Sequence, residues 1–335
     1  MRIGRLFGFL LLLPISAQAD NWADEKDYSD LAASKRICAQ FRAVALPDPH
    51  RQDQRPQGGM SGCSSEALYY MGRPGDAPAA FACAQREAAD EMFGGDMMLM
   101  TLYANGKGTP RDLDKAIALA CTLGGAPMEI HSRVQNLFAR RGNPSSEAEF
   151  EWCDDITSGY AMGACASHDQ RMATARRELK FKALKARWPQ AEAANKLEAL
   201  IKSAEAFAGS RAAEVDQSGT ARAAMVVAAE EEVMELLLED LNHVATNAPA
   251  LTQALSDSAA DSDLNQVYKK VMAGDFEEFA GTPTRDGIKS VQRQWLKYRD
   301  AWIGFFKLAR PEGAPQAMLN LQTRHRVAQL QELLP

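Results

Sequence analysis

The spacing of apolar residues predicts helices along most of the chain. The clearest case follows Thr282 and Pro283, where apolar residues recur at alternating steps of three and four and so share one helix face. The six residues are Ile288, Val291, Trp295, Tyr298, Trp302 and Phe305. Thr282 is the predicted N-cap and Pro283 the first helical residue, and Pro311 ends the helix. A stripe this aromatic either closes a helical core or contacts a partner.

Similar periodicity extends over the rest of the chain. Further helices are predicted over 23–46, 166–187, 190–216, 220–246, 263–279 and 315–334. Trp188 and Pro189 separate two of them, because proline cannot continue a helix. Loops are expected at 47–62, 142–146 and 247–263, the last with a short helix. The chain has few β-branched runs, so an all-α protein is predicted. Its 335 residues exceed one typical domain, so two or three units are expected.

A glycine turn stands out between residues 99 and 121. Gly106 and Gly108 suit a tight turn between two helices, and Asp112 is placed to cap the second helix, which carries Cys121. The run resembles a Sel-like repeat, a relative of the tetratricopeptide repeat, and a degenerate earlier unit is expected over 68–83. The resemblance implies stacked helical hairpins with a concave binding surface over residues 20–145. An ordinary helical hairpin is the alternative.

The first nineteen residues have the features of a secretory signal. Arg2 and Arg5 precede an apolar run at 6–15, and Ala17 and Ala19 mark a small-x-small cleavage site, so the mature chain is expected to start at Asp20. The apolar run of about ten residues is too short to span a bilayer of ~30 Å, and no later stretch qualifies. We expect a periplasmic or secreted protein without a membrane span after cleavage. A retained N-terminal anchor is the alternative.

The cysteine count fits export. The six cysteines are Cys38, Cys63, Cys83, Cys121, Cys153 and Cys165. An even number in an exported chain predicts up to three disulfides, with the pairing left open. Twelve residues of continuous helix would separate Cys153 and Cys165 by about 18 Å. A bond between them therefore needs a break, at Gly159 or Gly163; otherwise each bonds to another helix. The five histidines are scattered and no CxxC pair occurs, so neither a metal site nor a cofactor is expected.

Charge and motifs narrow the function. Loss of Arg2 and Arg5 takes the net charge from -6 to -8, which argues against nucleic acid and suits either a cationic protein partner or simple solubility. Phosphate-loop, HExxH and GxSxG patterns are absent from the sequence. The acidic residues at 154–155 and 230–232 are interpreted as solvated helix faces and a helix N-terminus. We therefore predict that the chain is not an enzyme.

Three short motifs mark the C-terminal segment. They comprise Thr252 and Gln253; Leu264, Asn265 and Tyr268, preceded by Asp263; and Gln292, Arg293, Trp295, Tyr298, Arg299 and Asp300. Together they resemble the LprI-type lysozyme-inhibitor family of small exported helical domains, over about residues 250–334. Arg324 resembles a later arginine of the family. Cysteines that many members carry around the last motif are absent here.

A weaker similarity links this segment to the one before it. A shift of 88 residues places Phe207 on Trp295 and Arg211 on Arg299. The segment from Cys153 to Cys165 resembles the cysteine-bearing start of the same family. We therefore predict a divergent LprI-like module over 146–246 and a second module over 247–335.

The family resemblance implies a binding function. It predicts an exported, non-catalytic protein that inhibits a lysozyme or a similar peptidoglycan-cleaving enzyme, and an acidic chain suits a cationic lysozyme. The alternative is a periplasmic repeat scaffold or immunity-type protein that binds another protein. We expect the aromatic stripe to pack in the core rather than to form an interface hot spot, because large aromatics dominate helical cores. Arg299 and Asp300 are expected to form a buried or half-buried pair.

Overall fold

The computed structural model describes residues 21–46, 63–73, 75–88, 91–143, 148–274 and 281–335. Within these ranges all the regular secondary structure is helical, which confirms the all-α prediction. Within the same ranges, none of the helices combines the length and the apolar character needed to cross a membrane. The predicted signal segment 1–19, the start at Asp20, the loop 47–62 and residues 144–146 of the predicted linker lie outside the described residues.

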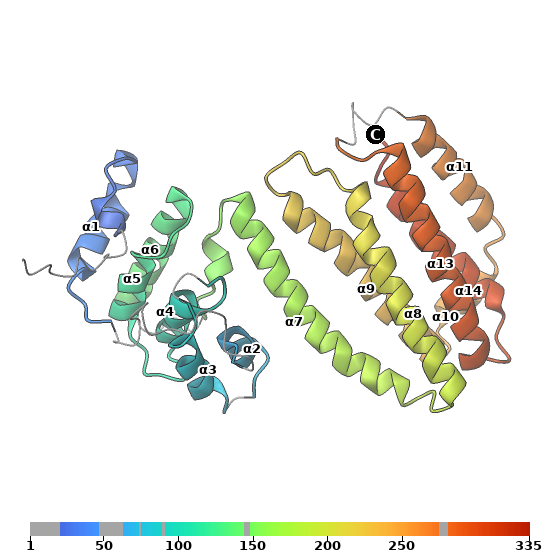
Figure 1. Ribbon diagram of the computed structural model, residues 1–335, viewed down its shortest axis with the longest axis horizontal. Helices are drawn as coiled ribbons and strands as arrows, with labels where there is room; N and C mark the ends of the chain where they lie inside the picture. The colour runs from blue at the N-terminus through green and yellow to red at the C-terminus, as the bar shows by residue number, and fades with distance from the viewer. Residues whose placement is uncertain (1–20, 47–62, 74, 89–90, 144–147, 275–280) are drawn as a thin grey trace, which may run out of the picture.

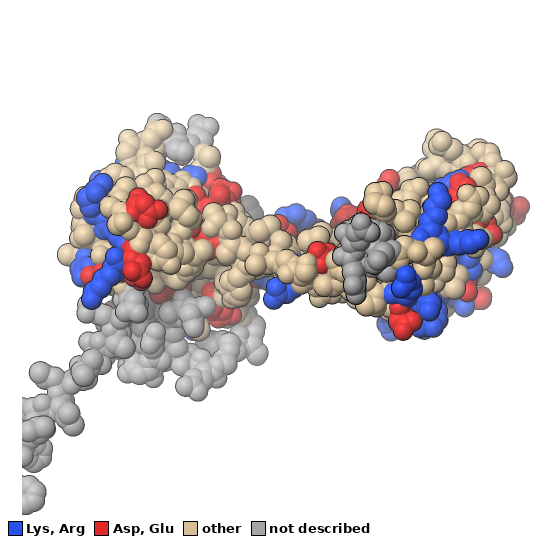
Figure 2. Space-filling model, turned by 90° about the horizontal axis from the view of Figure 1, so that it is seen from above, with Lys and Arg blue, Asp and Glu red and all other residues tan. Residues whose placement is uncertain are grey.

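The chain forms two lobes that are joined by one long helix, α7 (Gly159–Lys185). Figure 2 shows the narrower middle part between them from above. Each lobe has its own hydrophobic core, and the two cores divide along α7: Cys165 belongs to the first and Leu184 to the second. Both lobes therefore pack on opposite ends of the same helix. The predicted boundaries at 145 and 246 remain predictions.

The N-terminal lobe consists of short helices. They are η1 (Trp22–Asp24), η2 (Ser29–Leu31), α1 (Ala32–Phe41), α2 (Ser65–Tyr70), α3 (Ala77–Ala84), α4 (Gly95–Asn105), α5 (Leu113–Ala120) and α6 (Pro127–Gly142). The predicted helix over 23–46 is wrong in extent, because Tyr28 adopts a left-handed conformation with φ 59° that interrupts it. The glycine turn is confirmed: Gly106 caps α4 with φ 65°, and Asp112 accepts from the Lys115 amide at 3.1 Å. Whether these hairpins form a Sel-like repeat remains a prediction.

All six cysteines are paired. The bonds are Cys38–Cys121, Cys63–Cys83 and Cys153–Cys165. The last bond has the helix break that it requires, but at residues 156–158 rather than within α7, since Gly159 starts that helix and Gly163 lies inside it. Gly159 serves a different purpose: a Cβ there would lie 2.0 Å from the Thr220 carbonyl oxygen. Glycine thus allows the start of α7 to approach the segment before α9.

The C-terminal lobe is built from longer helices. After α7 come α8 (Ala191–Ser210), η4 (Arg211–Glu214), α9 (Arg222–Thr246), α10 (Pro249–Leu255), α11 (Ala260–Ala273), α13 (Arg285–Ala309) and α14 (Pro315–Gln331). The predicted break at Trp188 and Pro189 is confirmed. The predicted N-cap of α13 is wrong: Thr284 accepts from the Gly287 amide at 3.1 Å, whereas the hydroxyl of Thr282 accepts from the Gln217 amide at 2.7 Å.

Helices α8 and α13 pack together at the centre of this lobe, with α7 and α9 on one side and α11 and α14 on the other (Figure 1). A shift of 88 residues takes α7 onto 247–273, which α10 and α11 occupy, and α9 onto 310–334, which contains α14. The same shift takes α8 onto 279–298, the start of α13. These helix bounds agree with the predicted duplication, which remains a prediction.

Candidate functional site

Most of the motif side chains on α11 and α13 gather along one groove between these helices, which we call the motif groove. Its volume is about 420 Å³. It is lined by Asp261, Leu264, Asn265, Tyr268, Lys289, Gln292, Arg293, Trp295, Leu296 and Arg299. The lining positions recur at steps of three and four on each helix, so each wall is a single helix face. Motif residues that lie far apart in the sequence thus line one concave surface.

The aromatic stripe supports the groove from beneath. Trp295 is 1 % exposed, and Tyr298 and Trp302 are also buried in the core of the lobe. Tyr298 stacks on Phe207 of α8, with 5.5 Å between ring centroids. The prediction that the stripe is core is therefore confirmed. Complete burial raises the pKa of the Tyr298 hydroxyl, so this group stays protonated.

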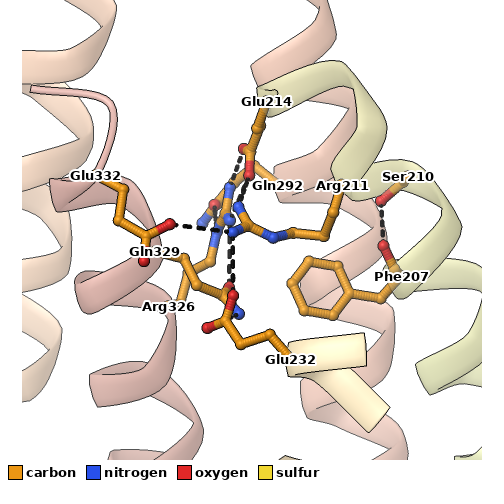
Figure 3. Close-up of polar contacts among 9 residues, drawn as sticks. All are labelled: Phe207, Ser210, Arg211, Glu214, Glu232, Gln292, Arg326, Gln329 and Glu332. Carbon is orange, nitrogen blue, oxygen red and sulfur yellow. Dashed lines mark hydrogen bonds and ion pairs between the residues drawn. The ribbon is translucent and has the colours of Figure 1, made fainter. Parts of the chain in front are cut away.

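Gln292 is held in place by a buried ionic network at the centre of the lobe (Figure 3). Its Oε1 accepts a hydrogen bond of 2.9 Å from Nε of Arg326, which is fully buried. Nη1 of Arg326 donates to Glu214 at 2.9 Å, and Arg211 bonds the same carboxylate. Two arginines thus share one buried carboxylate, an arrangement that is costly to break from either side. The network fixes the orientation of Gln292 on the α13 wall.

Two further carboxylates complete this network. Glu232 accepts from Gln329 at 3.2 Å and lies 3.4 Å from Nη2 of Arg211, while Glu332 lies 3.5 Å from the same nitrogen. The sequence reading missed these partners. The one available signal was a charged residue, Arg326, next to apolar Val327 in the final helix.

The opposite wall, α11, is fixed by Arg324. Its Nη2 donates to Asp257 at 2.7 Å, and its Nη1 donates to Asp263 at 2.6 Å. Asp257 precedes α11 and Asp263 lies in its first turn, so one guanidinium holds the start of α11 against α14. The hydrogen bond from Arg324 lowers the pKa of Asp257, which keeps the pair charged. The arginine that resembles a family position is therefore a structural clamp.

The α13 wall of the groove is basic. Arg299 stacks on Trp295, with 5.2 Å from its guanidinium carbon to the ring centroid, and pairs with Asp300 at 3.2 Å. The expected buried or half-buried pair does form, but only Arg299 is half-buried, with a side chain 24 % exposed, whereas the Asp300 side chain is 70 % exposed. Lys289 pairs with Asp286 at 3.3 Å. Within the described chain Arg293 is exposed and has no ion-pair partner, which leaves its charge available.

Several predicted residues lie elsewhere. Thr252 and Gln253 are exposed on α10 and do not line the groove. Of the acidic residues at 154–155, Asp155 accepts a hydrogen bond of 2.9 Å from the side-chain amide of Asn136. Burial raises the pKa of its carboxyl group. Glu231 is an ion-pair partner of Arg177. The described residues contain no group of His, Cys, Asp and Glu side chains that could hold a metal ion.

Comparison with known proteins gives one match. Residues 246–333 match the profile of the family described as Lysozyme inhibitor LprI. This match overlaps the predicted module 247–335 up to residue 333 and includes both walls of the motif groove. No curated protein and no solved structure matches the chain. The resemblance of the N-terminal region to Sel-like repeats has no support from a family match and remains a prediction.

Proposed function

We propose that this protein inhibits a lysozyme or a similar peptidoglycan-cleaving enzyme by binding it at the motif groove. The match of residues 246–333 to a lysozyme-inhibitor family carries this proposal. The groove adds a location, because exposed motif side chains from α11 and α13 meet there on a rigid helical support. Tyrosine and arginine, which line it, are over-represented at the energetic centres of protein interfaces.

The charges of the groove suit the active site of such an enzyme. Glycosidases of this kind hold two carboxylic acids beside the bond that they cleave. Arg293 presents an unpaired positive charge at the groove, and Lys289 lies one helical turn away. A basic edge of this type is complementary to an acidic cleft. The mature net charge of -8 acts at longer range and accelerates encounter with a cationic enzyme.

The proposal includes the absence of catalysis. Among the described residues that line the motif groove, Asp261 supplies the single carboxylate, whereas glycoside hydrolysis uses a pair. The matched family is one of inhibitors rather than hydrolases. Three disulfides and the match of residues 246–333 to a lysozyme-inhibitor family favour an exported protein that acts in the periplasm or outside the cell.

The test is a lysis assay. The purified mature chain is added in excess to lysozymes of several classes, and the turbidity of a cell-wall suspension is followed. We expect slower lysis with at least one class; full activity of all of them would contradict the proposal. A zymogram of the protein alone serves as the control, and a cleared band would show that the protein is itself a hydrolase.

A second candidate function is binding of another protein by the N-terminal lobe. A cavity of about 780 Å³ lies between the first residues of the described chain and the loop before α6. Its edge carries Trp22, Asp24, Glu25, Asp27 and Tyr28, and Tyr28 is 48 % exposed. Pull-down from periplasmic extract with the full mature chain and with Tyr28→Ala tests this function. A partner that both proteins capture equally would speak against this cavity.

A further inference from the structure

A second groove lies in the first module, between α7 and α8 above α9, and we call it the α7/α8 groove. Its volume is about 490 Å³. A shift of 88 residues takes three of its lining residues, Ile201, Glu205 and Ala208, onto Lys289, Arg293 and Leu296 of the motif groove. The two grooves therefore occupy corresponding positions. The second one lies outside the segment that matches the inhibitor family.

The base of the α7/α8 groove is apolar. Phe181, Ile201 and Met234 come from three different helices and are only partly buried against the core of the lobe. On α8, Ala208 has a small side chain and Gly209 has none, and a Cβ at Gly209 would meet no atom within 4 Å. Another chain can therefore approach this part of α8 closely and cover apolar surface there.

The free charges around this base are mainly acidic. Glu178 and Glu205 are exposed and have no ion-pair partner in the described chain, and Glu230 has only a hydrogen bond of 3.1 Å from the amide of Gln170. The basic residues that line the groove are largely occupied. Arg177 pairs with Glu231 and Glu235, and Lys185 pairs with Glu198. Lys182 alone faces the three free carboxylates, so a cationic occupant is electrostatically favoured.

The groove is elongated. Along α7 its lining residues recur at steps of three and four from Gln170 to Lys185, which corresponds to about 22 Å of helix. This length matches a helix of about 15 residues and exceeds a compact small molecule. A helix in such a groove presents apolar residues at three- and four-residue spacing to the base and keeps its charges at the edges.

We propose that the α7/α8 groove binds a cationic amphipathic helix of a protein partner. The apolar face of that helix rests on Phe181, Ile201 and Met234. Its lysine or arginine side chains meet Glu178 and Glu205. This binding site is separate from the motif groove and does not depend on the inhibitor proposal.

The test uses two synthetic fluorescein-labelled peptides of about 16 residues. Both carry leucines at helical spacing, and the remaining positions are lysine in one and glutamate in the other. In anisotropy titrations with the full mature chain, we expect saturable binding of the lysine peptide only. Glu205→Lys should weaken that binding about tenfold or more, and Ile201→Ala should also weaken it. Thermal melting verifies that each variant is folded.

Glu192→Lys is the matched control. Glu192 is exposed on the first turn of α8, away from the groove, and its replacement changes the net charge by the same amount. We expect its affinity to stay within about twofold of the unmodified chain. Equal losses for Glu205→Lys and Glu192→Lys would overturn the proposal, because they would indicate unspecific attraction to an acidic protein. Equal binding of both peptides, or an absence of saturable binding, would overturn it as well.

Discussion

Under the 88-residue shift, the motif groove and the α7/α8 groove occupy corresponding positions in the two predicted modules, yet the charges at these positions differ. Where the motif groove has Arg293, the other has Glu205, and where the motif groove has Lys289, the other has Ile201. The 88-residue shift also places buried Phe207 of α8 on buried Trp295 of α13, so this core position is aromatic in both helices. The buried position is thus aromatic in both helices, while the exposed positions differ in charge. We expect this difference to select different partners for the two grooves.

The starts of α7 and α11 are also attached to the rest of the protein in different ways. A disulfide, Cys153–Cys165, ties the start of α7 in the first module. In the second module Arg324 clamps the start of α11 through two carboxylates. The start of α7 thus has a covalent attachment, whereas the start of α11 has an ionic one. Differences in stability between these two attachments can be measured directly.

The largest expected effect concerns the shared aromatic position. Trp295→Ala and Phe207→Ala each remove a fully buried ring and should lower the free energy of unfolding by about 3–5 kcal/mol. Urea denaturation followed by circular dichroism measures both. Similar losses would support equivalent roles in the two modules. A loss below about 1 kcal/mol for Phe207→Ala would break the comparison.

Removal of the covalent attachment should have the next largest effect. Replacement of both Cys153 and Cys165 by serine should cost about 2–4 kcal/mol, because the unfolded chain regains loop entropy. Arg324→Ala removes the counterpart attachment and should cost about 1 kcal/mol or less, since that guanidinium is partly exposed to water. Denaturant titration of both proteins gives the order; a larger loss for Arg324→Ala would contradict it.

A change in the motif groove should affect inhibition rather than stability. Arg293→Glu reverses a charge on the α13 wall that has no ion-pair partner among the described residues, and it should raise the apparent inhibition constant about tenfold or more, which is about 1.4 kcal/mol. Lys297→Glu is the matched control, since Lys297 is exposed on the same helix but does not line the groove. The lysis assay measures both variants. Equal inhibition by the two would show that this groove is not the inhibitory surface.

The smallest expected effect is a dependence of stability on pH. Burial lowers the pKa of His325, but the hydrogen bond and charge of Asp240 outweigh burial and raise it overall. The same carboxylate raises the pKa of His243. Because both pKa values are raised in the folded state, their stabilisation is complete below the unfolded value of about 6.5 and is lost as pH rises through the folded values.

Melting temperatures between pH 5 and 8 measure this effect. We expect the melting temperature to fall as the pH increases above about 6.5. Asp240→Asn removes the charge that both histidines face and should flatten the profile. An equally steep profile for that variant would assign the pH dependence to other groups.

Local patterns predicted the fold well where one helix face carries the signal. The bounds of α9 and the break at Trp188 follow from apolar spacing and from proline, so they need no knowledge of distant residues. The interruption at Tyr28 was missed, because an isolated left-handed residue leaves no periodic signature. The start of α13 was placed too early, since Thr282 and Thr284 are both suitable caps and contact with Gln217 engages the first.

The candidate site was predictable only in part. The motifs indicated Asn265, Tyr268 and Arg293, but not that these side chains would line one groove, because the approach of α11 to α13 is a tertiary contact. The disulfide pairing was left open for the same reason. In the buried network, Arg326 bonds Glu214 across 112 positions of sequence, and no local pattern signals such a pairing.

The most direct test of the motif groove as the inhibitory surface is site-specific cross-linking. Benzoylphenylalanine is introduced at Leu296, which lines the groove, and separately at Lys297, the next residue on α13, which does not line it. Each protein is irradiated with a lysozyme that the unmodified chain inhibits. If the motif groove is the inhibitory surface, position 296 forms a cross-link to the lysozyme and position 297 does not. Equal cross-linking from both positions, or from neither, would contradict it.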